Sequence, residues 1–197
     1  MTAFRLVVTE GLLEVPVIQK LLASLGISDQ NTVYVQPRGG FWDRVPRYND
    51  AARHNLVLGL ADLESSPCPS GLIAEHLPHG VRPQFVLRIA ERMLESWLLA
   101  DKESLADFLR VSRHTFPRDP EGEEHPKRTL VNLARTSPDR AVLSDLVPEA
   151  GSRGIAGRAY RLRMTEYVLA HWRPARAARR SQSLRRAIAA IKVATQT

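Results

Sequence analysis

The chain of 197 residues has a single cysteine and no long apolar run. One cysteine, Cys68, excludes a disulfide framework and a zinc site built from several cysteines. No stretch approaches the roughly 20 apolar residues that a membrane-spanning helix needs. The apolar stretch within residues 1–11 ends on Glu10 and is too short for a secretory signal. These absences predict a cytoplasmic protein without a membrane span or targeting segment.

Three common enzyme motifs are also missing from the sequence. There is no Gly-x-Ser-x-Gly, no Walker loop and no Gly-x-Gly-x-x-Gly, so serine hydrolases, nucleotide triphosphatases and dinucleotide enzymes lack support. Hydrophobic residues make up 44% of the chain and charged residues 25%, which is typical of a globular protein with a proper core.

Acidic residues are scarce at the end of the chain. Residues 151–197 hold ten arginines and one lysine against the single Glu166, a net charge of +10. The whole chain carries +7, which leaves −3 for residues 1–150. This asymmetry favours a polyanionic partner such as nucleic acid, with DNA favoured over RNA, although solvated or internally paired arginines are the alternative. The arginines expected to contact phosphates are Arg173, Arg176, Arg179, Arg180, Arg185 and Arg186.

Apolar runs alternate with helical periodicity through the first part of the chain. Uninterrupted short runs predict buried strands, and apolar residues spaced three or four apart predict helices. Because the strands are apolar throughout, the pattern is typical of a parallel sheet with helices on both faces. We expect strands at 4–11, 32–37, 55–62 and 84–90, and helices at 16–26, 44–54 and 68–77.

From residue 91 onward the pattern becomes helical. The sequence therefore predicts an α/β core at 1–111 and a helical extension at 112–197, whose basic C-terminal helices pack on the core. Polar or glycine-rich composition predicts loops at 112–127 and 151–160. We expect helices at 91–101, 102–111, 128–137, 139–148, 161–172 and 174–194.

Acidic residues follow two of the predicted strands. Glu10 ends the first strand and Asp62 the third, and the carboxyl ends of parallel strands meet at one edge of a sheet. If the third strand persists through Glu64, this side chain points the same way as Asp62, and Glu14 lies one turn beyond Glu10. Clustered carboxylates repel unless a cation or proton lies between them, and oxygen ligands suit Mg²⁺ or Mn²⁺. The alternative is a solvated turn at Asp62.

These acids lie in stretches that resemble a known family. Glu10-Gly11 after the first strand and Asp62-x-Glu64 after a later one resemble the TOPRIM domain of topoisomerases, primases and overcoming-lysogenisation-defect nucleases. The longer resemblance is to small stand-alone TOPRIM-like proteins, often found beside AAA-type ATPases in bacterial genomes. The matching stretches are TEGLLE (9–14), ADLESS (61–66), RIAERMLESWLLAD (88–101), HPKRTLVNLAR (125–135) and SQSLRRAI (181–188).

The resemblance implies a TOPRIM-like sheet of about four parallel strands and a metal-dependent nuclease that acts with an ATPase, in anti-phage defence. It implies that Asp62 and Glu64 hold the metal and that Glu10 is a ligand or the general base. A divalent ion lowers the pKa of bound water and stabilises charge on phosphoryl oxygens. The chain departs from the family at Glu64, where an aspartate is usual, and at Thr9, where an apolar residue is more common.

Two further residues are candidates for the same site. Glu95 lies in an otherwise apolar stretch, which makes it a candidate for a metal-binding or supporting role because acids are rarely buried without a partner. The alternative is a local ion pair with Arg92, three residues earlier. Lys127 is a candidate for stabilising negative charge on a phosphate, and an ordinary surface lysine is its alternative.

Two rival functions stay open. A degenerate TOPRIM-like subunit would bind nucleic acid or an ATPase without cleaving, and the Glu64 departure favours it. A response-regulator receiver also has an aspartate at the end of its third parallel strand. A receiver needs Ser or Thr after its fourth strand, and this chain has LRIAE (87–91) there.

Overall fold

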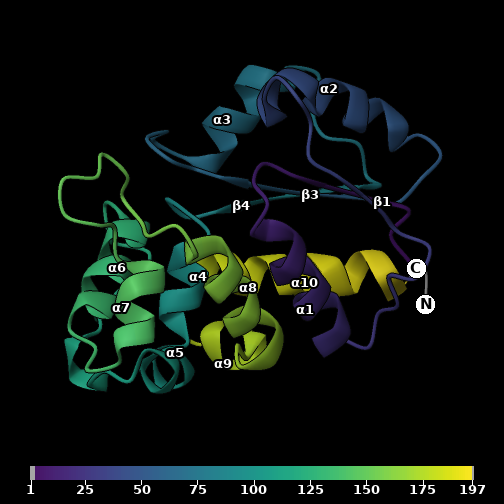
Figure 1. The fold of residues 1–197 in the computed structure, drawn as a ribbon. Coiled ribbons are helices and arrows are strands. Elements are labelled where there is room, and N and C mark those ends of the chain that lie inside the picture. Colours follow the sequence, from purple (N-terminus) through teal and green to yellow (C-terminus); the bar gives the residue numbers. More distant parts are fainter. Residues whose placement is uncertain (1–2, 197) are drawn as a thin grey trace.

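The computed structural model describes residues 3–196 of the chain. The protein is α/β, with four parallel strands in one sheet of order β2-β1-β3-β4 and helices on both faces (Figure 1). This arrangement confirms the parallel sheet of about four strands that the sequence predicts. The strands are β1 (Leu6–Thr9), β2 (Val33–Val35), β3 (Val57–Asp62) and β4 (Phe85–Ala90).

The strand register brings three chain segments to one edge of the sheet. Thr9, the last residue of β1, lies opposite Leu60 of β3, and Asp62 ends β3 opposite Ala90, the last residue of β4. The residues that follow β1, β3 and β4 therefore leave the sheet at the same edge. This is the edge at which open parallel sheets bind their ligands.

Helices cover the two faces of the sheet differently. On one face lie α2 (Phe41–Ala51) and α3 (Pro69–His76), and on the other lie α1 (Glu14–Ser24) and the long C-terminal helix α10 (Gln182–Gln196) (Figure 1). Strand side chains alternate between these layers, as the pleat requires. Val8 packs with the α2 side chains, and its neighbour Val7 packs in the core on the α1 and α10 side.

The remaining helices pack together beside α1, at the lower left of Figure 1. A single core joins them to the sheet and runs from Phe4 to Ile191, with Trp97 and Trp172 fully buried in it. No helix within residues 3–196 has the length and apolar character to cross a membrane. These elements are α4 (Glu95–Ala100), α5 (Lys102–Leu109), the 3₁₀ helix η1 (Arg113–Thr115), α6 (Pro126–Arg135), α7 (Arg140–Leu146), α8 (Tyr160–Ala170) and α9 (Pro174–Ala177).

Two element boundaries near the carboxyl edge differ from the sequence prediction. β3 ends at Asp62, because Glu64 takes a left-handed conformation with a φ of 49°. The helix expected at 91–101 begins at Glu95, after a turn in which Arg92 has a φ of 60°. The Asp62 carboxylate accepts a hydrogen bond of 2.8 Å from the Leu94 amide, so a contact between β3 and this turn fixes where α4 begins.

The acid-rich loop before α6 is tied to the C-terminal helix. The Glu121 carboxylate accepts hydrogen bonds at the start of α10 from the Ser181 hydroxyl (2.6 Å) and from the amides of Gln182 and Ser183 (both 2.9 Å). The first amides of a helix have no partner within the helix, and the carboxylate satisfies them. Ser183 also accepts a 2.7 Å hydrogen bond from the indole of Trp97, which joins α10 to α4.

Candidate functional site

A cavity of about 210 Å³ lies at the carboxyl edge of the sheet. Three acids from different elements line it: Glu14 at the start of α1, Asp62 at the end of β3 and Glu95 at the start of α4. The N-terminal turns of α6 and α8 contribute Lys127 and Tyr160. The structure thus brings Glu14, Asp62, Glu95 and Lys127 into one cavity from positions up to 113 residues apart, between Glu14 and Lys127.

Glu10 and Asp62 are held by hydrogen bonds that leave part of each carboxylate free. Glu10 lies just after β1, and its Oε2 accepts a 3.1 Å hydrogen bond from the Asp62 amide. Asp62 in turn uses Oδ1 to accept from Leu94. The second oxygen of each carboxylate makes no hydrogen bond with residues 3–196. Each acid therefore keeps an oxygen for a ligand while its position is fixed by the backbone of another element.

Gly11 makes room for the Glu14 carboxylate. A Cβ built on Gly11 would lie 2.6 Å from Glu14 Oε2 and 2.9 Å from Oε1, which is closer than such atoms approach. Glu14 itself is buried, at 6% exposure. The Glu-Gly pair therefore has a steric explanation: any side chain at position 11 would push the carboxylate of Glu14 out of its place.

The acids at this edge share an unfavourable electrostatic environment. Burial raises the pKa of Glu14 to about 7, and the charges of Glu95 and Glu10 add to the effect. Burial also raises the pKa of Asp62 well above its ordinary value, with further contributions from Glu14, Glu95 and Glu10. The pKa of Glu10 is raised by burial as well, and Glu64 contributes through its charge. A cation or bound protons would relieve this repulsion.

Glu95 contacts two residues that come from the helical part of the chain. Its Oε1 accepts a 3.0 Å hydrogen bond from the hydroxyl of the buried Tyr160 and lies 3.9 Å from Lys127 Nζ. The ammonium of Lys127 also lies 4.8 Å from the centre of the Tyr160 ring, within cation–π range. Arg92 instead donates to the carbonyl of Glu64 at 3.1 Å. Glu95 is therefore paired across the cavity with Lys127, and not locally with Arg92.

Glu64 does not reach the cavity. Its left-handed turn follows the end of β3, its amide donates to the carbonyl of Arg92 at 2.7 Å, and its side chain is exposed. Across the part of the chain that the structure describes, no group of three Asp, Glu, His or Cys side chains is close enough to hold a metal ion. The carboxylates gather at one edge without forming a ready-made coordination sphere.

Tyr160 and Arg161 also line the cavity, and sequence reasoning missed both. Tyr160 was expected at the end of a glycine-rich loop, and Arg161 as one basic residue among many in a C-terminal helix. Sixty-five residues separate Tyr160 from its partner Glu95, so no local pattern links them. An aromatic residue directly after a loop, at the first position of α8, was the available signal.

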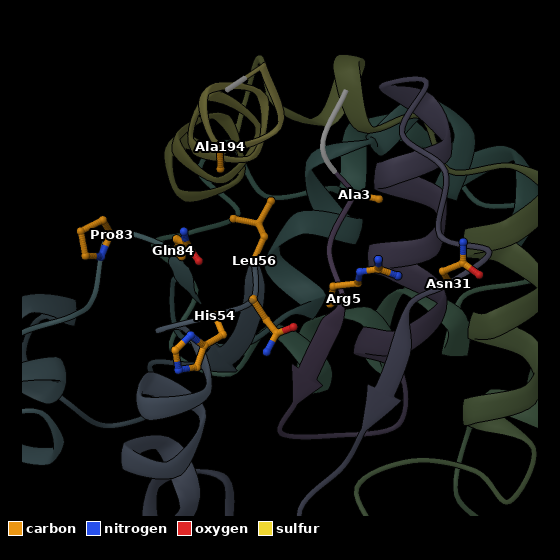
Figure 2. A pocket seen from close by; sticks show the side chains of 9 residues that line it. Ala3, Arg5, Asn31, His54, Leu56, Pro83, Gln84 and Ala194 are labelled. Atoms are coloured by element: carbon orange, nitrogen blue, oxygen red, sulfur yellow. The ribbon is translucent and has the colours of Figure 1, made fainter.

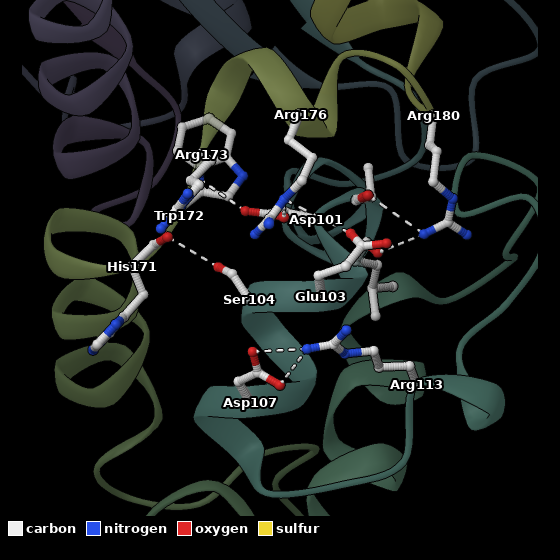
Figure 3. A network of polar contacts seen from close by, with 12 residues as sticks. Asp101, Glu103, Ser104, Asp107, Arg113, His171, Trp172, Arg173, Arg176 and Arg180 are labelled. Carbon is white, nitrogen blue, oxygen red and sulfur yellow. Dashed lines mark hydrogen bonds and ion pairs between the residues drawn. The ribbon is translucent and has the colours of Figure 1, made fainter.

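Three of the six arginines expected to bind phosphates have partners within the protein for their guanidinium groups. Arg176 pairs through its guanidinium with Asp101 and lies 3.7 Å from Glu103 (Figure 3). Arg180 donates to the main-chain oxygens of Pro117 and Arg118, the second at 3.2 Å. Arg185 donates to the carbonyl of Ala178 at 3.3 Å.

The other three arginines are available at the surface. Arg173, Arg179 and Arg186 are exposed, and their guanidinium groups make no hydrogen bond or ion pair within residues 3–196. Arg173 contributes its backbone amide, which donates to Asp101 at 2.8 Å (Figure 3). Among the six arginines, these three side chains are therefore the ones without a partner in the described residues.

A second, larger cavity of about 840 Å³ opens at the opposite, amino edge of the sheet (Figure 2). Arg5, His54 and Gln84 line it, together with Ala194 near the end of α10. None of the acids at the carboxyl edge reaches this cavity. Because ligands of open parallel sheets bind beyond the carboxyl ends of the strands, the smaller cavity is the better candidate site.

Comparisons of the chain with protein-family models, with curated proteins and with solved structures find no match. The candidate site therefore rests on geometry. The buried Glu14 and Glu95, the half-buried Asp62 and Lys127 come from four separate elements, α1, α4, β3 and α6, and line one cavity.

We predict that Glu14→Gln changes how stability depends on pH. The folded-state pKa of Glu14, about 7, lies above its ordinary value of 4.5, so ionisation opposes folding as the pH rises from 4.5 through 7. At about 1.4 kcal/mol per pKa unit, the charge costs the wild type about 3 kcal/mol by pH 7.5. Urea unfolding in metal-free buffer should show E14Q more stable at pH 7.5 and equal at pH 4.5.

The matched control for this prediction is Glu75→Gln, an exposed glutamate on α3 away from the cavity. This variant should follow the wild-type profile. Equal pH profiles for E14Q and E75Q would show that Glu14 is not part of a crowded anionic cluster.

We predict that Arg176→Ala and Arg173→Ala differ sharply in stability. Asp101 is fully buried and pairs with the Arg176 side chain, so removing this partner leaves an unpaired buried charge, at a cost of about 3–5 kcal/mol. The contact of Arg173 with Asp101 uses the backbone amide and survives substitution, so R173A should stay within about 0.5 kcal/mol of wild type. Urea unfolding measures both, and equal losses would contradict a structural role for Arg176.

Proposed function

We propose that this protein is a TOPRIM-like, metal-dependent nuclease subunit that hydrolyses phosphodiester bonds with Mg²⁺ or Mn²⁺. The observation that carries the proposal is the convergence of Glu14, Asp62 and Glu95 with Lys127 on one cavity at the carboxyl edge. In metal-dependent phosphodiester hydrolysis, carboxylates bind the divalent ion, and a nearby ammonium group such as that of Lys127 can contact the phosphate. The Glu-Gly and Asp-x-Glu motifs in the sequence support the same proposal.

The acids suit a hard divalent ion in their chemistry and charge. Their donors are all oxygens, which Mg²⁺ and Mn²⁺ prefer. Burial, and after it the repulsion between neighbouring carboxylates, raises the pKa values of Glu14 and Asp62, and a bound cation would relieve that repulsion. Asp62 and Glu14 would hold the ion, with Glu10 as a third ligand or as the general base. When bound, the ion supplies a polarised phosphoryl oxygen and a water of lowered pKa.

The side chains around the acids have separate tasks in this proposal. Glu10 does not itself line the cavity, but the Asp62 amide holds it beside the site. Its second oxygen has no hydrogen-bond partner among residues 3–196 and would accept a proton. Tyr160 holds Glu95 by its hydroxyl, which keeps that carboxylate in place when Lys127 moves toward a phosphate. Lys127 would then neutralise negative charge on the phosphate.

Two partners belong to the proposal. The net charge of +10 on residues 151–197, with the unpaired Arg161, Arg173, Arg179 and Arg186 among them, supports nucleic acid as one partner. An AAA-type ATPase is the second, and it rests on the resemblance to stand-alone TOPRIM-like proteins, with a role in anti-phage defence.

A degenerate subunit that binds without cleaving is the second candidate function. Two observations favour it: Glu64 lies outside the cavity, and the acids among residues 3–196 do not form a ready-made group of three ligands. Such a protein would keep the fold and the basic surface and would not retain divalent ions.

We predict that Asp62→Asn abolishes cleavage in Mn²⁺ and raises stability in metal-free buffer. Asparagine keeps an acceptor for the Leu94 amide and removes the charge that Glu10, Glu14 and Glu95 oppose. Because the pKa of Asp62 is raised in the folded protein, its ionisation opposes folding, so the D62N protein should have a higher unfolding free energy than the wild type at pH 7.5. Oligonucleotide cleavage and urea unfolding measure the two effects.

Asp43→Asn is the control, since Asp43 is an exposed acid on α2 away from the site. It should change neither cleavage nor stability. A D62N protein that is destabilised and still cleaves would make Asp62 a turn-capping residue. Wild-type protein that neither cleaves nor binds Mn²⁺ would favour the degenerate subunit.

A further inference from the structure

We infer that the cavity takes single-stranded nucleic acid and excludes an intact duplex. The inference rests on the proposed function, because it names the substrate that the same site would accept. Three features of the cavity support it. The first is the depth of the acids, and the second is the hydrogen bond that fixes the roof of the cavity, formed by Lys127 and Tyr160, to these acids. The third is the presence of an apolar side chain and an unpaired arginine at the site.

Two of the three acids, Glu14 and Glu95, lie too deep for a duplex backbone to reach, and Asp62 is half-buried. Glu14 is 6% exposed and Glu95 5%, and the cavity of about 210 Å³ is smaller than the 300–1,000 Å³ of ordinary small-molecule pockets. It has room for part of one nucleotide. Enzymes whose reacting atoms lie this deep act on single strands or extract a nucleotide from the stack.

The roof of the cavity is fixed to its floor. Lys127 and Tyr160, at the starts of α6 and α8, lie over the acids, and the Tyr160 hydroxyl bonds to Glu95 at 3.0 Å. Tyr160 is itself 5% exposed, and α8 packs against α1, the helix that carries Glu14. Because these contacts join floor and roof directly, the cavity does not widen without breaking a buried hydrogen bond.

Two more residues that line the cavity, Leu12 and Arg161, suit the base and the phosphate of a single strand. Leu12, 48% exposed, is an apolar surface beside the carboxylates. Arg161 is exposed, and its guanidinium has no hydrogen bond or ion pair with any described residue. A single strand presents a base face and a phosphate close together, and proteins bind these with apolar and cationic side chains. In a duplex the base faces are stacked and would leave Leu12 without a partner.

The test compares a 20-nucleotide single strand with a blunt duplex of the same sequence. Binding is followed by fluorescence anisotropy in Ca²⁺ and cleavage in Mn²⁺. We expect the single strand to bind and be cleaved at least tenfold better. Arg161→Ala should weaken single-strand binding about tenfold, as for the loss of a hydrogen bond to a charged group. Arg158→Ala, three residues earlier, removes an exposed arginine that pairs with Glu149 at 3.7 Å and lies outside the cavity, so it should change binding less than twofold.

The outcomes separate this inference from the proposed nuclease activity. Single-strand binding that depends on Arg161, without cleavage in any metal, would support the inference and reject the nuclease. Cleavage of duplex as fast as single strand would support the nuclease and overturn the inference. Failure to bind the single strand, or equal effects of R161A and R158A, would also overturn it.

Discussion

The hydrogen bond between the Leu94 amide and the Asp62 carboxylate is the contact on which the candidate site depends. It joins the end of β3 to the turn after β4, and so places Glu95 at the first position of α4 beside Asp62. The Asp62 amide in turn binds Glu10, which follows β1. Two hydrogen bonds thus tie three segments together at the carboxyl edge, and each uses only one oxygen of an acid. Because these bonds hold the segments together, their carboxylates lie close enough to repel one another.

The sequence predicted the sheet and the gathering of acids better than it predicted their geometry. Apolar runs located all four strands, and the rule that parallel strands end at one edge brought Glu10, Glu14 and Asp62 near one another. Glu64 was expected beside Asp62 because strand side chains alternate, but its left-handed turn removes it from the cavity. The predicted start of α4 was wrong for a related reason. The Leu94 amide, just before the first residue of α4, donates to the Asp62 carboxylate 32 residues earlier, and no local pattern shows this contact. Tyr160 and Arg161 were not identified because tertiary packing brings them to the site.

The basic C-terminal region combines structural and exposed arginines. Arg176 joins α9 to Asp101, between α4 and α5, as Figure 3 shows. Arg180 joins the chain after α9 to the carbonyl of Pro117, in the loop after η1. The Glu121 carboxylate fastens the loop before α6 to α10. Helix packing holds α6 and α8, which carry Lys127 and Tyr160, beside the acids: α6 packs against α4, and α8 packs against α1. Helix α9 also packs against α4. Net charge alone therefore overstates the number of arginines available for a nucleic acid.

The central claim is that the carboxylates of Glu14 and Asp62 bind the same divalent ion in the cavity at the carboxyl edge. Crystals soaked in Mn²⁺ and measured for anomalous scattering test it most directly, because the signal locates the ion without reference to activity. We predict one strong peak in the cavity, at about 2.0–2.2 Å from carboxylate oxygens of Asp62 and Glu14, the distance typical of a small hard ion. No peak in the cavity at saturating Mn²⁺, or a peak only at exposed acids such as Glu64, would contradict it.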